Sequence, residues 1–384
     1  MKVLHVVPSL ARAAGGPPTA VLGMARALAA AGASVRVAAT DHGGPQLRSD
    51  EAFELSLYRC RFCPWRWSPG LGRSLHGAVR WADVVHVHTL WTHPVQAAAA
   101  ASRRAGVPYL LRPAGMLDAW SMGQRPWRKR AYLAAREQRT IRGAALLHWT
   151  SEEERERSSS WSGGAAGVVI PLGLPPTAAD AGARERFFAR HPALAGRRVI
   201  LFLGRVHAKK RPALIVEALP ALRARVPQAT LVVAGHVDEP AYLDALRRRA
   251  GELGQADALH VLGDLPSAQV AEALAAADVL ALPSQQENFG LAVAEALAAG
   301  VPVVITRAVA LAPLVERHGA GWVVEPRAEG VAGALIAALQ DEPQRAARGA
   351  RGRAAARAEL SWESVAPRLL AAYDQVLAAP RRER

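Results

Sequence analysis

Short apolar runs alternate with longer amphipathic stretches along almost the whole chain. Runs of about four to eight residues, rich in Val, Ile and Leu and bounded by Gly or Pro, are typical of buried strands in a parallel sheet. Between them, helical periodicity predicts helices, as in residues 19–31, which Gly32 ends. Strands alternating with helices predict an α/β fold with doubly wound parallel sheets. The predicted strands are residues 2–8, 35–40, 84–88, 108–111, 146–149, 199–203, 230–235, 259–263, 277–283 and 301–306.

The length of the chain, 384 residues, is enough for two domains that each bury a core. Residues 169–176 are rich in Pro and Gly, which is typical of a connector. We therefore expect a first domain over residues 1–172 and a second over residues 173–360.

Two acidic residues, Glu287 and Glu295, follow the predicted strand 277–283. Glu287 lies in the loop after the strand, and Glu295 about one turn into the next helix, which Gly300 ends. Open α/β sheets bind ligands at this end of their strands. The amides of residues 289–291 lie near a helix N-terminus and favour an anion. Carboxylates suit hydroxyl groups instead, so the segment predicts a phosphate bound between two hydroxyl-bearing rings.

A second motif follows strand 199–203, where Gly204 and Arg205 begin a turn that also carries Lys209 and Lys210. A strand, a tight Gly turn and several cations suit a diphosphate, because Arg grips two oxygens and Lys acts as a point charge. Lys210 is the expected second cation, and Lys209 competes with it because one residue of loop slack would exchange them.

The glutamate pair, with Asn288-Phe289-Gly290 after the first, resembles the E-x7-E signature of retaining GT-B glycosyltransferases of family 4. The resemblance implies two Rossmann-like domains facing a deep cleft, and a nucleotide-diphosphate sugar as co-substrate with no cofactor. Arg205 and Lys210 match the family's diphosphate-binding pair. It also implies that Glu287 holds the donor sugar and Glu295 its ribose. The other donor-binding residues that it implies are Gly15, Gly16, Gly204, Gly263, Asn288, Phe289, Gly290 and Leu291.

The acceptor side carries a more specific resemblance. Residues 112–120 read Arg-Pro-x-Gly-Met-Leu-Asp-x-Trp, which is similar to an exopolysaccharide-type subgroup and lacks the His that many relatives carry there. Arg112 and Asp118 are the acceptor-side candidates. The implied reaction transfers a sugar to a glycan or lipid-linked glycan in cell-surface polysaccharide synthesis. The last stretch resembles the family's terminal helix, so residues 361–384 are expected to pack back onto the first domain.

The formal charge of +15 is uneven, since residues 1–175 hold 22 Lys and Arg against 11 Asp and Glu, while the rest holds 26 against 22. Seven cations between Arg125 and Arg142 face a single acid, with aromatic residues between them. This mixture suits an anionic membrane surface, although a solvated helix in an Arg-rich chain is nearly as good an interpretation. Nucleic acid is not expected. The predicted membrane contacts are Arg125, Trp127, Arg128, Lys129 and Arg130.

No apolar run is long enough to span a bilayer, and the N-terminal run lacks a signal-peptide layout. The chain is therefore expected in the cytoplasm, either free or peripheral on the inner face of the plasma membrane. Cys60 and Cys63 cannot complete a four-ligand zinc site alone, so we expect no metal, with a labile disulfide as a minor alternative. His86, His88 and His93 are interpreted as packed or solvated, because no carboxylate cluster accompanies them.

Three other classes of protein share parts of this pattern. A dehydrogenase of the Rossmann type would need G-x-G-x-x-G, which is absent. A GT-B nucleotide-sugar 2-epimerase has a different signature near residues 286–289, and a non-catalytic nucleotide-sugar binder has no need of the full Arg, Lys and Glu set. The last two classes remain as alternatives.

Overall fold

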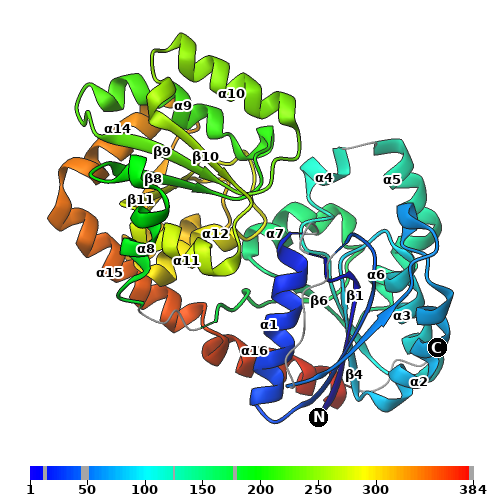
Figure 1. Ribbon diagram of the computed structural model, residues 1–384. Coiled ribbons are helices and arrows are strands. Elements are labelled where there is room, and N and C mark those ends of the chain that lie inside the picture. Colours follow the sequence, from blue (N-terminus) through cyan, green and yellow to red (C-terminus); the bar gives the residue numbers. More distant parts are fainter. Residues whose placement is uncertain (12–14, 45–51, 124–125, 176–179, 380–384) are drawn as a thin grey trace. The chain divides into compact units, whose positions relative to one another are not determined.

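The computed structural model describes residues 1–11, 15–44, 52–123, 126–175 and 180–379. The chain forms two compact units, one of Met1–Pro175 with Ser361–Arg384 and the other of Pro176–Leu360. The chain passes from one unit to the other after Pro175, whereas the sequence placed this boundary after residue 172. Each unit is a parallel sheet covered by helices, as the hydrophobic pattern predicted (Figure 1).

The first unit contains a seven-stranded sheet in the order β3-β2-β1-β4-β5-β6-β7. Every pair of neighbouring strands is parallel. The order runs outward in both directions from the neighbours β1 and β4, so this sheet is doubly wound and its strand order reverses between them. The strands are β1 (Lys2–Ser9), β2 (Ser34–Thr40), β3 (Glu54–Tyr58), β4 (Val84–His88), β5 (Tyr109–Arg112), β6 (Leu146–Trp149) and β7 (Gly167–Val169).

Helices cover both faces of this sheet. The longer ones are α1 (Gly16–Ala30), α2 (Pro69–Trp81), α3 (His93–Ala105) and α16 (Trp362–Ala378). Shorter helical segments are α4 (Ala119–Gly123), α5 (Pro126–Tyr132), a π-helical turn (Leu133–Glu137), α6 (Gln138–Arg142) and α7 (Glu152–Ser158). The terminal helix α16 packs against α1, so the end of the described chain lies on the first unit (Figure 1).

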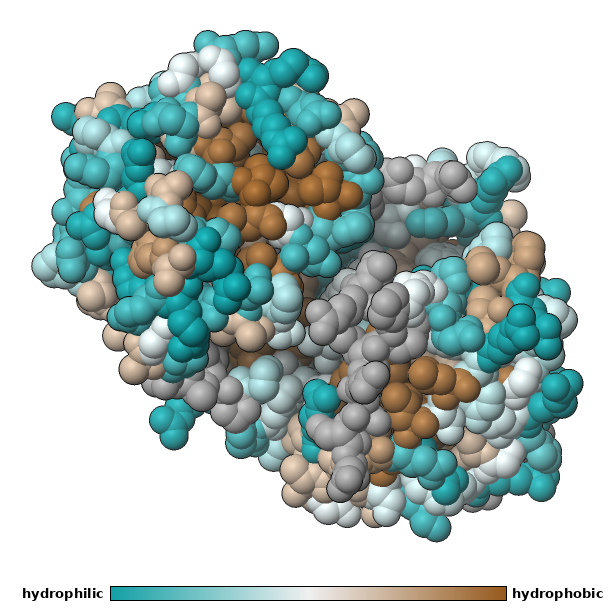
Figure 2. All heavy atoms as spheres, viewed as in Figure 1, coloured by the Kyte–Doolittle hydropathy of each residue, from teal (hydrophilic) through white to brown (hydrophobic). Residues whose placement is uncertain are grey.

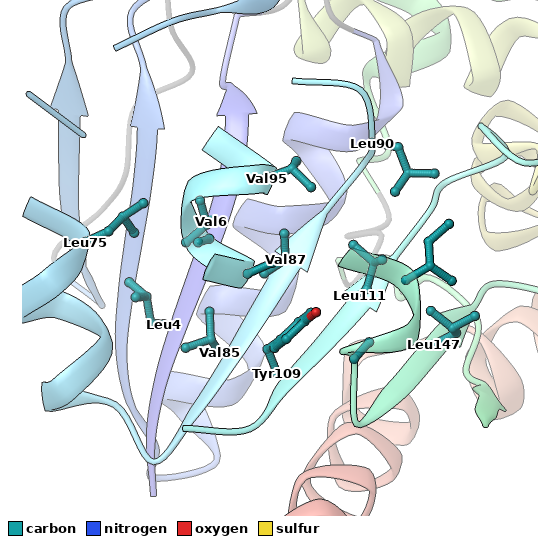
Figure 3. Close-up of a cluster of buried hydrophobic side chains, with 14 of the residues drawn as sticks. Leu4, Val6, Leu75, Val85, Val87, Leu90, Val95, Tyr109, Leu111 and Leu147 are labelled. Carbon is teal, nitrogen blue, oxygen red and sulfur yellow. The ribbon is translucent and has the colours of Figure 1, made fainter. Parts of the chain in front are cut away.

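The apolar core of this unit lies on one face of its sheet. Alternate residues of the central strands, such as Val6, Val85 and Leu111, point to the same side and meet Leu75 of α2 and Val95 of α3 (Figure 3). All of these side chains are almost fully buried. Burial of one such side chain stabilises the fold by about 1.5–3 kcal/mol, so this face supplies much of the stability of the unit.

The second unit contains a six-stranded parallel sheet in the order β10-β9-β8-β11-β12-β13, which reverses between β8 and β11. Its strands are β8 (Arg198–Leu203), β9 (Ala229–Ala234), β10 (Leu259–Gly263), β11 (Val279–Leu282), β12 (Val303–Thr306) and β13 (Gly321–Val324). Its helices are α8 (Ala183–Arg190), α9 (Pro212–Arg223), α10 (Pro240–Glu252), α11 (Ser267–Ala276), α12 (Leu291–Ala299), α13 (Ala312–His318), α14 (Ala328–Gln340) and α15 (Glu342–Glu359). Figure 2 shows mostly hydrophilic residues over the outer side of α10, which buries Leu243, Leu246 and Ala250 inward.

All ten predicted strands are present, but β3, β7 and β13 were missed. Strand β7 lies partly inside the stretch that we interpreted as a connector. Helix α1 begins at Gly16 and not at residue 19, with prolines in its first turn, where the missing amide hydrogens cost nothing. Among the described residues, no helix combines the length and the apolar character needed to cross a bilayer.

Candidate functional site

The candidate donor site lies in the second unit, where the order of the strands reverses. Strands β8 and β11 are neighbours there, with Val279 beside Ile200 and Leu280 beside Leu201. The loops that follow these strands therefore leave the sheet side by side. One carries Arg205 and Lys210, and the other carries Glu287. A crevice at such a reversal is the usual ligand site of an open α/β sheet.

The two loops are joined by an ion pair between predicted site residues. Lys210 Nζ lies 2.6 Å from Glu287 Oε2, and the two side chains are 17% and 20% exposed. A main-chain bond supports it, because the Gln285 amide donates to the Lys209 carbonyl at 2.8 Å. Arg205 is more exposed and pairs with Asp238 at 3.0 Å. The structure thus brings Lys210, and not the competing Lys209, against Glu287.

Glu287 is held in place by the segment after β12. Its amide donates to the Ala308 carbonyl at 3.1 Å, and its carbonyl accepts from the Ala310 amide at 3.2 Å. These bonds form a short parallel bridge centred on Val309. The backbone of Glu287 is therefore fixed at both its donor and its acceptor, which orients the side chain toward Lys210.

Two glycines allow the turns after β8 and β9 to approach each other. Gly204 has φ 139° and Gly235 has φ 138°. A Cβ on Gly235 would lie 2.1 Å from the Gly204 carbonyl oxygen, so only glycine fits there. A Cβ on Gly204 would lie 3.4 Å from Lys210 Nζ, which shows how closely that amine passes over the turn. Gly235 was not predicted as a site residue, although it ends a predicted strand as Gly204 does.

Helix α12 begins where the sequence placed its N-terminus. Gly290 adopts φ 91° just before Leu291, the first residue of the helix, and Gly300 ends the helix at φ 77°. The first amides of the helix have no partner within it, so they are available to an anion. Glu295 lies one turn further on, and burial raises its pKa to about 7. Asn288 is half-buried and Phe289 is buried, while Gly263 ends β10 at φ 73°.

The Gly15–Gly16 pair lies in the first unit at the start of α1. Gly15 adopts φ 76°, and a Cβ built on it would meet nothing within 4 Å. The space beside Gly15 is therefore open, and its backbone conformation favours glycine. Residues 12–14 of the same predicted turn lie outside the described residues.

A cluster of buried polar side chains lies on the other face of the central strands in the first unit. His5, His86, His88 and His148 are all fully buried there, and Tyr373 of α16 covers them. The strand register explains the cluster, since His5 lies beside His86 and His88 lies beside Arg112. The histidines were interpreted singly in the sequence. The missed signal is that His86 and His88 are two residues apart on one strand and so share a face.

Hydrogen bonds fix the tautomer of each histidine. The Nε–H of Arg112 can only donate, so His88 Nδ1 accepts it at 3.1 Å and His88 Nε2 donates to His5 Nδ1 at 2.9 Å. The Ile170 carbonyl can only accept, so His148 Nε2 donates to it at 2.8 Å. His148 Nδ1 then accepts from His86 Nε2 at 3.2 Å.

His86 Nδ1 in turn accepts from the Tyr373 hydroxyl at 2.8 Å, so all four rings are neutral and protonated at Nε2. Burial, and after it the Arg112 charge, lowers the pKa of both His5 and His148 to about 3. Burial is also the main cause that lowers the pKa values of His86 and His88 well below the usual range.

The acceptor-side candidates Arg112 and Asp118 are both buried. Burial lowers the pKa of Arg112 to about 10, so its guanidinium remains charged at neutral pH. Its Nη2 has no hydrogen-bond partner among the described residues. The loop between Arg112 and Asp118 is anchored by Glu154, which accepts from the Gly115 amide at 2.6 Å and from the Thr150 amide at 2.7 Å. Nothing in the sequence distinguished Glu154 from its neighbouring glutamates.

Strained backbone follows strand β4 in the same unit. Thr89 and Trp91 adopt φ 69° and 68°, which is costly for residues other than glycine and is often found at functional sites. The buried carboxylate of Glu137, on the π-helical turn, accepts from the Trp91 amide at 2.7 Å. Burial raises the pKa of Glu137 to about 7. Trp91 also packs edge-on against Tyr132, with ring centroids 6.0 Å apart.

The side chains of the basic segment, residues 125–142, differ in their exposure to solvent. Trp127 is 70% exposed, and the Arg128 guanidinium lies 5.1 Å from its ring. Arg130 is also exposed, but Lys129 is half-buried and donates to the Ser121 carbonyl at 2.6 Å. The single acid of the segment, Glu137, is buried beneath it. Arg125 lies outside the described residues.

Comparisons with known proteins agree with this architecture. The family model for glycosyl transferases group 1 matches residues 183–355, and that for a glycosyl transferase 4-like domain matches residues 15–173. Similar curated proteins include a D-inositol 3-phosphate glycosyltransferase of Xylanimonas cellulosilytica, which is 30% identical over 78% of this chain and 73% of the relative. A GDP-mannose-dependent phosphatidylinositol monomannoside mannosyltransferase of Mycobacterium tuberculosis is 31% identical, over 59% of this chain and 61% of the relative's length.

Solved structures extend the similarity to the whole fold. Anabaena HepE, crystallised with UDP and glucose, matches with a TM-score of 0.78 at 18% identity, over 98% of this chain and 100% of that structure. At 18% identity, this match is evidence for the fold alone. The chain therefore belongs to the glycosyl transferases group 1, and its two parallel-sheet units have the GT-B fold.

Proposed function

We propose that the chain is a retaining glycosyltransferase that moves a sugar from a nucleoside diphosphate sugar to a hydroxyl group of a glycan or lipid-linked glycan. The observation that carries the proposal is the Lys210–Glu287 pair at the reversal between β8 and β11. The pair lies at the carboxyl ends of the strands, where open α/β sheets bind ligands. A cation and a carboxylate held together there suit a substrate in which a diphosphate adjoins a sugar. The relatives named for GDP-mannose and the neighbour bound to UDP support a donor of this class.

In this function Arg205 and Lys210 neutralise the charge that develops on the leaving diphosphate. Such preorganised charge is usually the largest contribution to catalysis in a site of this kind. The free amides at the start of α12 add donors for the same oxygens. Glu287 then accepts from the donor sugar and Glu295 from the ribose. Because Lys210 donates to Glu287 at 2.6 Å, the same amine can reach the diphosphate only by sharing or exchanging this contact.

On the acceptor side, the aromatic rings and strained backbone after β4 suit a sugar ring. Trp65 donates from Nε1 to the Tyr132 hydroxyl at 2.8 Å and lies edge-on to His93, so these rings are held in place. A hydroxyl-rich acceptor fits such aromatic surfaces, which supports a glycan or glycolipid acceptor. One relative is named for phosphatidylinositol monomannoside, which is a lipid-linked acceptor, and another for D-inositol 3-phosphate, which carries no lipid. The first name supports a lipid-linked acceptor, and neither supports the predicted role in surface polysaccharide.

Turnover with defined donors tests the proposal. Full-length protein is incubated with UDP- and GDP-sugars and with lipid-linked or free glycans, and nucleotide release and glycoside formation are both measured. We expect Arg205→Ala and Lys210→Ala each to lower kcat by roughly a hundredfold or more, with circular dichroism unchanged. Lys209→Ala is the matched control in the same loop and should retain most activity.

The products separate the alternatives. A new glycoside of retained configuration, with one nucleoside diphosphate per transfer, supports the proposal. A changed nucleotide sugar without transfer would instead identify an epimerase, and tight donor binding without any product a binder. Normal turnover in both Arg205→Ala and Lys210→Ala would refute the assignment of the site.

A further inference from the structure

Cys60 and Cys63 lie beside a third side chain of metal-binding character. His42 follows β2, and the cysteine pair follows β3, the neighbouring strand. Thr40 is paired with Tyr58, so the two loops leave the sheet side by side. The ligand atoms of His42, Cys60 and Cys63 all lie within 4.8 Å of one another. The sequence suggested no third ligand, because His42 is 18 residues before Cys60.

The upper bound of 4.8 Å on the separations of these atoms is compatible with one small tetrahedral ion. Zinc–sulfur bonds of about 2.3 Å and zinc–nitrogen bonds of about 2.0 Å place neighbouring ligand atoms roughly 3.5–3.8 Å apart. Two thiolates and an imidazole are a ligand set typical of zinc, and an ion held by three side chains keeps one position for water. Both cysteines are free thiols in the structure.

The cysteine loop has a rigid turn of its own. Residues 63–65 form a 3-10 turn, and the Arg66 amide donates back to the Cys63 carbonyl at 3.1 Å. The Trp67 amide donates to the Phe62 carbonyl at 3.0 Å, which closes a small hairpin. A hairpin that presents two thiols three residues apart is preorganised for metal, because little chain ordering remains to be done when the ion binds.

Hydrogen bonds around the three side chains hold the two loops together. The Cys60 amide donates to Asp41 Oδ1 at 2.8 Å, and the Asp41 amide donates to the Tyr58 carbonyl at 3.0 Å. The His42 carbonyl accepts from the Ser9 hydroxyl of β1. Outer contacts of this kind orient metal ligands and are part of a built metal site.

We propose that His42, Cys60 and Cys63 bind one thiophilic divalent cation, zinc by its ligand chemistry. Both cysteine thiols release their protons to solvent when the ion binds, and the two thiolates balance its charge. The ion fastens the loop after β2 to the loop after β3. It thereby fixes Trp65, whose ring donates to the Tyr132 hydroxyl and packs edge-on against His93 at 5.5 Å. The ion thereby holds an aromatic side chain in the loop after β3 of the first unit.

Cobalt titration of the reduced full-length protein tests the site directly. Protein stripped of metal by a chelator is titrated with Co²⁺, whose thiolate bonds give a near-ultraviolet charge-transfer band. We expect one Co²⁺ per chain, displaced by equimolar Zn²⁺. Cys60→Ser and Cys63→Ser should each abolish most of the band. His42→Gln should weaken binding by roughly tenfold or more and shift the visible bands, since a nitrogen ligand is replaced.

The matched control is His76→Gln. His76 is an exposed histidine on α2 of the same unit and does not belong to the His42–cysteine cluster. This variant should bind Co²⁺ as the wild type does. Hydrogen exchange of residues 55–70 should also slow when Zn²⁺ is added to wild type but not to Cys63→Ser. No charge-transfer band in reduced wild type would overturn the proposal. So would unchanged Co²⁺ affinity in His42→Gln, or a Cys60–Cys63 disulfide in protein isolated without oxygen.

Discussion

At the scale of single residues, Glu295 and the four histidines of the first unit have strongly shifted pKa values. Glu295 is partly exposed in the second turn of α12, and desolvation raises its pKa to about 7. Four neutral histidines form the layer on the sheet of the first unit, with their pKa values lowered mainly by burial. The protonation of both groups changes with pH. We expect the protonation of Glu295 to affect donor binding and that of the histidines to affect the stability of the fold.

Donor binding is predicted to weaken below neutral pH. If Glu295 accepts from the ribose, its ionised form binds better, and protonation below pH about 7 removes this preference. The dissociation constant of the nucleoside diphosphate sugar, whose phosphates do not titrate in this range, should rise by up to about tenfold per pH unit below that value, as measured by calorimetry. In Glu295→Gln the same titration should be nearly flat. A flat titration of the wild type would contradict the ribose role.

The glutamates are also predicted to differ in kinetics. Glu295→Gln should mainly raise the donor KM, because the ribose is held equally in the ground and transition states. Glu287→Gln should mainly lower kcat, because the sugar develops positive charge as the leaving group departs. Since Glu287→Gln also releases Lys210 from its ion pair, affinity for a nucleoside diphosphate without sugar should be kept or improved. Equal effects of both variants on KM and kcat would remove the distinction.

The histidine layer is predicted to make the fold sensitive to acid. The pKa of each histidine is lower in the folded than in the unfolded chain, so protons bind the unfolded chain first. The layer's contribution is complete above the unfolded pKa of about 6.5 and is lost as pH falls toward about 3. Each such histidine lowers the unfolding free energy by about 1.4 kcal/mol per pH unit in this range.

Urea unfolding between pH 7.5 and 5 measures this slope. His148→Leu should reduce the slope by one histidine's share, even though it also lowers stability at pH 7.5 by leaving His86 Nε2 without its acceptor. His76→Gln, at an exposed position, controls for the loss of a histidine as such. A wild-type stability that does not change between pH 6.5 and 5 would show that the layer is protonated or open to water.

At the scale of elements, the contact between α1 and α16 depends on two glycines. The Trp362 ring at the start of α16 lies against Gly23 of α1 and against Gly173, where an added Cβ would come within 2.4 Å and 2.3 Å of it. Trp362 is also tied to the same segment through its amide, which donates to the Leu174 carbonyl at 3.3 Å. Gly23 and Gly173 therefore leave the space in which the Trp362 ring of the terminal helix packs on the first unit.

Alanine substitutions at Gly23 of α1 and at Gly77 of α2 should change the stability in opposite directions. Gly23→Ala gains helix propensity but displaces the Trp362 ring, so it should lower the free energy of unfolding by about 1–3 kcal/mol. Gly77→Ala, in α2 with nothing near the added Cβ, should raise it by up to about 1 kcal/mol. Denaturant unfolding of both variants decides the matter. A stabilised Gly23→Ala protein would mean that the ring moves away without cost.

The elements also show what a sequence can predict. Strands such as β4 and β6 were placed to the residue, because fully buried strands are continuous apolar runs. Strand β3 was missed because it is an edge strand with the exposed Leu57, and β13 because it is also an edge strand and is only partly buried. The link between Lys210 and Glu287 could be anticipated only from the resemblance. The histidine layer and the His42–cysteine cluster required strand register, which no local pattern contains.

At the scale of the whole molecule, positive charge is concentrated in one unit. The first unit carries most of the excess. Helix α5, the π-helical turn and α6 display five exposed arginines with no ion pair among the described residues: Arg128, Arg130, Arg136, Arg139 and Arg142. The one acid of this stretch is buried, so nothing on the surface neutralises these cations locally. The exposed ring of Trp127 lies at the beginning of the same segment.

We therefore predict that the protein binds anionic bilayers through this segment. Anionic lipid attracts clustered Lys and Arg, and a Trp ring inserts at the level of the headgroups. Co-sedimentation with vesicles rich in phosphatidylglycerol should exceed that with phosphatidylcholine and should fall as salt rises from about 0.05 to 0.5 M. Trp127→Ser with Arg128→Gln and Arg130→Gln should abolish most of the binding. Lys129→Gln should change it less, because that amine is already bonded to Ser121.

The control for this experiment must remove charge without removing the segment. Arg247→Gln with Arg248→Gln does so, since both are exposed on α10 of the other unit. If net charge alone drives binding, this variant should lose affinity in proportion to its two charges. If the basic segment drives it, the variant should bind as the wild type does. Equal binding to neutral and anionic vesicles, or binding that high salt leaves intact, would exclude an electrostatic membrane surface on the first unit. A lipid-linked acceptor would then have to reach the enzyme by other contacts.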